Sequence, residues 1–169
     1  MDAIEAILTR RSIREYIKKS IDDKTLKELL EAAMSAPSAG NEQPWHFILI
    51  NDPKILKEVP SFHNHAKMLS DASTAILVCC DKRLEKHGEM WIQDCSAATE
   101  NILIAVNAKG LGAVWLGIYP RDERVNGMRK LLGLPEHIIP FSLISIGYPS
   151  EKKPPADRYD ASRIHYNKW

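Results

Sequence analysis

Basic and hydroxyl side chains gather near the amino terminus, in the segment RRSIREY. Arg10, Arg11, Ser12 and Arg14 fall within five positions of one another. Guanidinium groups bind phosphate oxygens through paired N–H donors, and a serine hydroxyl or backbone amide can complete an anion site. Basic residues at the end of a short helix also complement the helix dipole. The motif alone therefore leaves phosphate binding and a structural role both open.

A second polar group lies in the segment APSAGNEQPW, between an expected helix and an expected strand. Ser38, Asn41 and Gln43 carry side chains that hydrogen-bond amides and heterocycle edges, and a loop held between rigid elements is a common binding surface. The same segment also suits a difficult turn, because Pro37 ends a helix and Gly40 accepts left-handed backbone angles. On this second interpretation the tryptophan of the segment simply belongs to the core.

Two more groups could contact a ligand. Asn64 and Lys67 are three positions apart, would share one helix face, and from it could reach one planar polar group. His63 and His65 have no third metal ligand in view, so we expect solvated side chains rather than a metal site. Gly117 interrupts the apolar run AVWLGIYP, where a glycine permits close approach of something flat or bulky.

Several familiar catalytic patterns are missing from the sequence. No GxGxxG follows an expected strand, no Walker A segment occurs, and no serine sits in a nucleophile elbow. Glu42, Asp94 and Glu100 do not form an obvious acid pair, which gives little support to hydrolysis by two carboxylates. The residues therefore predict ligand binding more clearly than side-chain catalysis.

The elements that must position these groups alternate along the chain. Helices are expected at 2–9, from Asp22 or Asp23 to just before Pro37, at 88–109 and at 123–133, with short helical pieces at 52–59 and 63–72. Strands are expected at 46–50, 74–80, 112–119 and 141–148. The 88–109 helix is apolar over much of its circumference, which predicts a central buried helix. The alternation by itself favours a parallel α/β sheet.

Bulk composition predicts one compact domain. The chain has 169 residues with 44% hydrophobic content, enough for one substantial core. The 23 basic and 22 acidic residues give no general attraction to nucleic acid or membranes. No apolar run approaches the roughly 18 residues of a membrane span, and no leader opens the chain, so we expect a cytoplasmic protein.

The cysteines and the last twenty residues give two further expectations. Cys79, Cys80 and Cys95 have no zinc or iron–sulfur spacing and are expected as buried thiols, the first two facing opposite sides of a strand. Residues 150–169 contain adjacent prolines, many charges and few core candidates, so they cannot fold on themselves.

Five sequence blocks together resemble the nitroreductase family of FMN-dependent oxidoreductases. They are RRSIREY, APSAGNEQPWHF, NHAKML, WLGIYP and IGYP followed by KKPPADRYD, in the family's order and over nearly the whole chain. The resemblance implies an α+β fold: a mainly antiparallel sheet flanked by helices around a long central helix. It also implies a homodimer with FMN at the subunit interface and a single FMN-binding domain over 1–169, whose tail, 150–169, embraces the partner.

The resemblance also implies the FMN contacts. The basic motif would hold the phosphate and ribityl chain together with Arg158, and the loop beginning at Pro37 would lie against the isoalloxazine of the other subunit. Asn64 and Lys67 would contact the polar edge of the ring, while the Leu116 and Gly117 backbone would approach N5. The implied cofactor-binding residues are Arg10, Arg11, Ser12, Arg14, Pro37, Ser38, Ala39, Asn41, Asn64, Lys67, Leu116, Gly117 and Arg158.

An FMN cofactor would explain why no catalytic side chain and no metal site is predicted, because the flavin itself carries the redox chemistry. NADH or NADPH would donate hydride to N5, and a nitroaromatic, quinone-like or related acceptor would take both electrons in a second, ping-pong step. Three alternatives stay open: a specialised reductase or dehydrogenase of the same fold acting on an unknown metabolite, a flavin-binding protein without turnover, and a phosphate-binding module that uses only the arginine motif. The chain also lacks the helical insertions that cover the flavin in longer family members.

Overall fold

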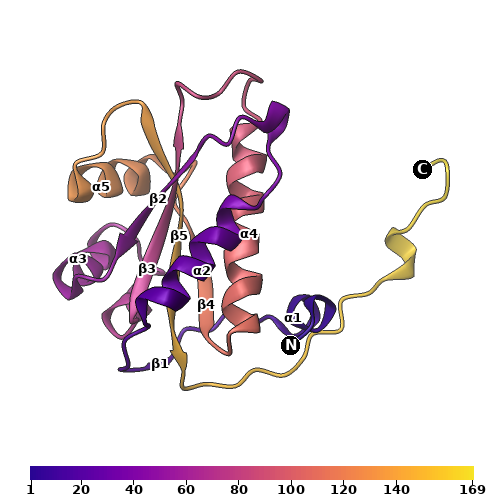
Figure 1. Ribbon diagram of the computed structural model, residues 1–169, viewed down its shortest axis with the longest axis horizontal. Helices are drawn as coiled ribbons and strands as arrows, with labels where there is room; N and C mark the ends of the chain where they lie inside the picture. The colour runs from indigo at the N-terminus through magenta and orange to yellow at the C-terminus, as the bar shows by residue number, and fades with distance from the viewer.

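One antiparallel sheet of five strands forms the centre of the computed structural model, which describes residues 1–169 (Figure 1). The strands are β1 (Tyr16–Ile17), β2 (Trp45–Ile50), β3 (Thr74–Asp81), β4 (Gly112–Gly117) and β5 (Ile138–Pro149). β5 pairs with β3, β4 and β1, and β2 pairs with the outer side of β3. Every one of these pairings is antiparallel, as the family resemblance implies.

The parallel sheet that the alternation of elements favours is wrong, and the order of the strands explains why. β3 and β4 are both antiparallel to β5, so they run in the same direction, and the helix between them makes an ordinary crossover. The last strand, β5, then inserts between them. Because β5 is separated from β3 by more than fifty residues of chain, no local pattern reveals this insertion.

The helices begin and end close to where the sequence predicts. They are α1 (Ala3–Thr9), α2 (Asp23–Met34), α3 (Pro53–Glu58), α4 (Trp91–Ala108) and α5 (Asp122–Leu132), with 3-10 turns η1 (Ala39–Asn41), η2 (Val59–Ser61), η3 (Lys67–Ser70) and η4 (Ala161–Arg163). The Asp22 carboxylate caps α2 by accepting from the Thr25 amide at 2.8 Å, and Gly133 ends α5 with a φ of 64°. Gly88 and Glu89 have positive φ angles, so α4 starts at Trp91 rather than at 88. The helix expected over 63–72 is only the short turn η3.

The core lies in two layers, one on each face of the sheet. α2 and α4 cover one face and α3 and α5 the other (Figure 1). β3 is buried along its whole length, and its neighbouring cysteines face opposite layers: Cys80 with Cys95 and Trp45 on the α4 side, and Cys79 on the α5 side. The prediction of three buried thiols is confirmed.

Two segments extend the molecule at one end of α4. The Asn107 side-chain amide, near the end of α4, donates to the Ala6 carbonyl of α1 at 2.9 Å. The segment after β5 first contacts residues 11–14, then leaves the body of the molecule and folds only as the turn η4 (Figure 1). Its Tyr166 and Trp169 side chains are exposed. None of the helices has the length and apolar character of a membrane span.

Candidate functional site

A cavity of about 460 Å³ brings together five of the predicted ligand-contacting residues from three parts of the chain. Arg14, Asn64, Lys67, Leu116 and Gly117 all line it. Asn64 and Lys67 reach it from a turn and the start of η3 rather than from one helix face. The cavity is also lined by five residues that the sequence analysis did not select as ligand contacts: His63, His65, Met68, Trp115 and Arg124.

Gly117, the last residue of β4, leaves one wall of this cavity open. A Cβ atom built at Gly117 would meet no atom within 4 Å, whereas one built at Gly112, at the start of the same strand, would collide with Ile13 at 2.6 Å. The missing side chain therefore gives a ligand direct access to the backbone here, as the position of this glycine predicts.

The Gly117 carbonyl is held by two side chains. The Arg124 Nη1 atom donates to it at 2.7 Å, and the His63 Nε2 atom lies 3.2 Å away. The His63 Nδ1 atom accepts from the His65 amide at 3.3 Å, which assigns the proton to Nε2 and makes that atom the donor.

His63 is not the solvated side chain that the sequence predicts, because it is only 1% exposed. Burial lowers its pKa from 6.5, and the neighbouring Arg124 charge lowers it further. A neutral imidazole fits the hydrogen bonds that this ring makes with Gly117 and His65. The expectation failed because a histidine in a polar stretch such as SFHNHAK gives no local sign of its burial.

The first two arginines of the basic motif have partners outside the cavity. The Arg10 Nε atom pairs with a carboxylate oxygen of Glu100 on α4 at 3.3 Å. The Arg11 Nε atom donates to the Pro154 carbonyl at 2.8 Å, while its buried Nη2 atom has no partner. These contacts join the motif to α4 and to the beginning of the tail.

The remaining residues of the motif are also fixed by the segment after β5. The Lys153 ammonium donates to the Ser12 carbonyl at 2.7 Å, and the Arg14 amide donates to the Glu151 carboxylate at 2.5 Å. The Arg14 side chain stays available to the cavity. Of the basic motif, the structure thus places only Arg14 at the cavity.

The loop after α2 is a strained turn that α4 holds in place. Gly40 and Asn41 have φ angles of 52° and 56°. The Ser38 hydroxyl accepts from the Gln43 amide at 3.0 Å, and the buried Asp94 carboxylate of α4 accepts from the Ala39 amide at 3.0 Å. The interpretation as a difficult turn is therefore correct for the backbone, and Trp45 is buried in the core.

A second contact holds the same loop from the connection between β3 and α4. The Glu42 carboxylate accepts from the Lys86 amide at 2.6 Å. A Cβ at Gly40 would lie only 2.2 Å from the exposed His87 ring, so a larger residue here would require that ring to move.

The loop and α1 lie at opposite ends of α4. Asp94 contacts the loop and Asn107 contacts α1, and thirteen residues of helix span about 20 Å. Pro37, Ser38, Ala39 and Asn41 do not line the cavity of their own chain. Arg158 does not line it either and lies in the exposed tail.

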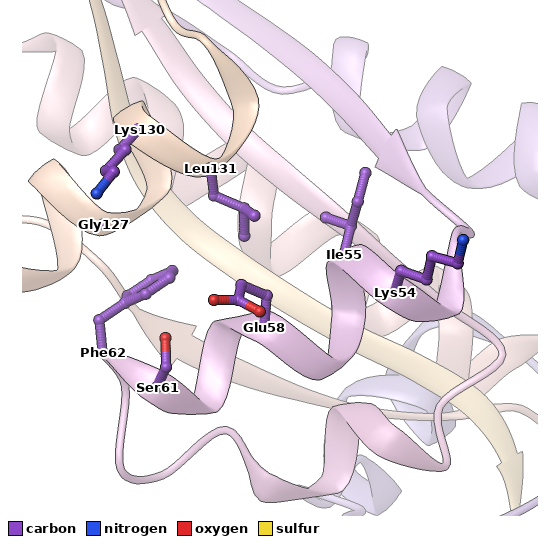
Figure 2. Close-up of a pocket in the computed structure, with 8 residues that line it drawn as sticks. All are labelled: Lys54, Ile55, Glu58, Ser61, Phe62, Gly127, Lys130 and Leu131. Atoms are coloured by element: carbon purple, nitrogen blue, oxygen red, sulfur yellow. The ribbon is translucent and has the colours of Figure 1, made fainter.

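A larger cavity of about 640 Å³ opens between α3 and α5 and contains none of the predicted residues (Figure 2). Phe62 packs there so closely on Gly127 that a Cβ at the glycine would lie 2.4 Å from the ring. Lys54 and Lys130 are the basic residues at its edges.

The family model described as the nitroreductase family matches residues 7–73 and 61–148 of the chain. The chain belongs to the nitroreductase family. A relative from Archaeoglobus fulgidus, provisionally named NADH dehydrogenase/NAD(P)H nitroreductase, is 51% identical over 172 residues, which cover 99% of both chains. The predicted family is thereby confirmed.

Solved nitroreductase-fold structures confirm the predicted fold. A provisionally named NADH oxidase from Clostridium acetobutylicum has a TM-score of 0.94 and 44% identity, covering 97% of this chain and 99% of its own. A provisionally named nitroreductase from Desulfovibrio desulfuricans, solved in complex with FMN, has a TM-score of 0.86 and 28% identity, covering 100% and 98%. The predicted enzyme class and cofactor are those found among these relatives.

Proposed function

We propose that this nitroreductase-family chain is an FMN-dependent oxidoreductase that works with NADH or NADPH in the cytoplasm. The observation that carries the proposal is the cavity in which the Arg14, Asn64 and Lys67 side chains surround the open backbone at Gly117. Residues 1–169 would form one FMN-binding domain, with residues 150–169 as its extended tail.

The residues that line the cavity suit the chemical parts of FMN. Arg14 and Lys67 provide cations for a phosphate and for the polar edge of a flavin ring, and Asn64 provides an amide that can donate and accept. No acidic side chain lines the cavity, so these positive charges are not neutralised there. Preorganised cations and backbone dipoles of this kind stabilise negative charge that develops on a bound group.

FMN would supply two-electron chemistry at N5, taking hydride from NADH or NADPH and passing the electrons to a nitroaromatic, quinone-like or related acceptor in a ping-pong cycle. The protein's part is to fix the ring and to leave one of its faces open. Gly117 serves this part because it carries no side chain toward the cavity. Neither a catalytic base nor a nucleophile is required of the chain.

A homodimer would complete the site. Pro37, Ser38, Ala39 and Asn41 do not line their own chain's cavity, and in this proposal they contact the FMN held by the partner. The apolar side chains Ile4, Ile7 and Leu8 of α1 are exposed in the single chain, as are Tyr166 and Trp169 of the tail. Burial of such surface is the usual driving force for subunit association.

Flavin titration of the purified protein tests this proposal. We expect one FMN per chain, and weaker binding of riboflavin, which lacks the phosphate. The double variant Arg14→Met with Arg158→Met should lose the preference for FMN over riboflavin. Wild-type protein that binds neither flavin, or a double variant that keeps its full FMN content, would contradict the proposed site.

A further inference from the structure

Arg124 occupies a position that the stability of its own helix does not explain. It lies in the first turn of α5, after the acidic residues Asp122 and Glu123. The positive end of the helix dipole favours those acids and opposes a cation. Arg124 also forms no ion pair with any carboxylate in the structure, although it is half-buried.

The contacts of Arg124 instead point to the cavity. Its Nη1 atom donates to the Gly117 carbonyl at 2.7 Å, and Arg124 lines the same cavity as Arg14 and Lys67. With the His63 Nε2 atom at 3.2 Å, this carbonyl has a donor for each of its two lone pairs. The orientation of the Gly117 peptide is therefore fixed by groups from α5 and from the turn before η3.

We propose that Arg124 is a positioning residue for the flavin: it fixes the Gly117 backbone that faces the ring and adds positive charge that favours the reduced state. The inference rests on the proposed FMN site. It assigns a role to a residue that none of the five sequence blocks contains. No acidic residue lines the cavity, so no carboxylate there neutralises the positive charge of Arg124 before it acts on a bound ligand.

Three variants separate the charge of Arg124 from its hydrogen bond. Arg124→Gln keeps a long side chain with an N–H donor but removes the charge. Arg124→Lys keeps the charge but loses the planar fork. Lys130→Gln removes one charge from the exposed side of the same helix, next to the other cavity (Figure 2), and serves as the matched control.

The measurements are the FMN dissociation constant of the apoprotein, the midpoint potential of the bound flavin and the thermal midpoint of the apoprotein. We expect Arg124→Gln to weaken FMN binding about tenfold, as replacement of a charged hydrogen-bond donor by a neutral one does, and to make the potential more negative. Arg124→Lys should restore the potential and bind FMN less tightly than wild type. Lys130→Gln should match wild type in all three measurements.

The outcomes distinguish this inference from the proposed function. If Arg124→Gln binds FMN with wild-type affinity and potential, the role of Arg124 is wrong while the flavin site stands. If the wild-type apoprotein takes up no FMN, both are wrong. If Arg124→Gln fails to fold, Arg124→Lys decides: equality with wild type in affinity overturns the inference, and weaker binding at an unchanged potential supports it.

Discussion

The Asp94 carboxylate and the Ala39 amide join the central helix to the loop that follows α2. Asp94 Oδ1 accepts from the Ala39 N–H at 3.0 Å, and the side chain that makes this contact is almost fully buried. The second carboxylate oxygen, Oδ2, is buried without a partner. A loop proposed to contact the partner's flavin is thus anchored from inside its own chain.

The first prediction concerns this anchor. Asp94→Ala should lower the free energy of unfolding by about 1 kcal/mol, because the half-buried Ala39 amide loses its hydrogen-bond acceptor. It should also weaken FMN binding, since the loop loses its fixed position. Asp94→Asn keeps an acceptor oxygen and should resemble wild type more closely. Urea unfolding and FMN titration measure both effects.

Gln93, exposed on the same turn of α4, provides the control for this test. Gln93→Ala should leave unfolding and FMN binding unchanged. An Asp94→Ala protein that unfolds at the same urea concentration as wild type, and binds FMN equally well, would show that the anchor has no energetic importance.

The second prediction uses the two glycines at the ends of β4. Gly112→Ala should destabilise the fold by about 1–3 kcal/mol, because its Cβ would collide with Ile13. Gly117→Ala should leave the apoprotein's stability nearly unchanged, because its Cβ would point into open space, yet should weaken FMN binding. Thermal unfolding of the apoproteins and flavin titration separate the two. Tight FMN binding by Gly117→Ala would argue against a ring close to this backbone.

The third prediction is a pH dependence that arises from His63. Its pKa is lowered from 6.5 in the folded chain, chiefly by burial. As the pH falls below 6.5, the unfolded chain takes up a proton at this imidazole before the folded chain does, so folding stability decreases. His63→Gln, which keeps a donor for the Gly117 carbonyl, should lose less stability than wild type between about pH 7 and pH 5. If the free energy of unfolding falls equally with pH in the two proteins, His63 is not the source of the pH dependence.

The fourth prediction concerns the tail. Tyr166→Ala combined with Trp169→Ala should leave the unfolding of an isolated chain unchanged, because both side chains are exposed. The same change should shift a homodimer toward monomers, which light scattering over a range of protein concentrations would detect. A double variant that dimerises at the same protein concentration as wild type would show that these aromatic residues do not contact the partner.

The fifth prediction tests which part of the loop faces the flavin. Ala39→Trp should reduce FMN binding and leave the core intact, because Ala39 is only half-buried and its side chain is not part of the core. Far-ultraviolet circular dichroism would confirm the fold, and FMN fluorescence quenching would report the affinity. Unchanged affinity would place the ring elsewhere.

The elements that the sequence predicts well are those with local signals. Asp2 and Asp22 begin their helices as caps, and Gly133 ends α5, each directly next to the helix that it bounds. The antiparallel arrangement of the strands has no such local signal, because it depends on the pairing of β5 with strands far away along the chain. Only the family resemblance supplied it.

The residues of the candidate site also fall into two groups: those that the sequence indicates and one that only the tertiary structure reveals. Arg14, Asn64, Lys67 and Gly117 belong to sequence blocks that resemble the family, and the structure gathers them in one cavity. Arg124 is absent from those blocks and meets Gly117 only in the tertiary structure. A lone arginine on an amphipathic helix is normally a solvated residue, so the sequence offered no reason to choose it.

The most direct test of the central claim is an anaerobic absorption spectrum of the purified, FMN-loaded protein, recorded before and after addition of NADH or NADPH. We predict a bound-flavin spectrum that one of the two nucleotides bleaches, and that a nitroaromatic or quinone then restores. A protein that stays colourless with added FMN, or whose bound flavin neither nucleotide reduces, would contradict an FMN-dependent NAD(P)H oxidoreductase.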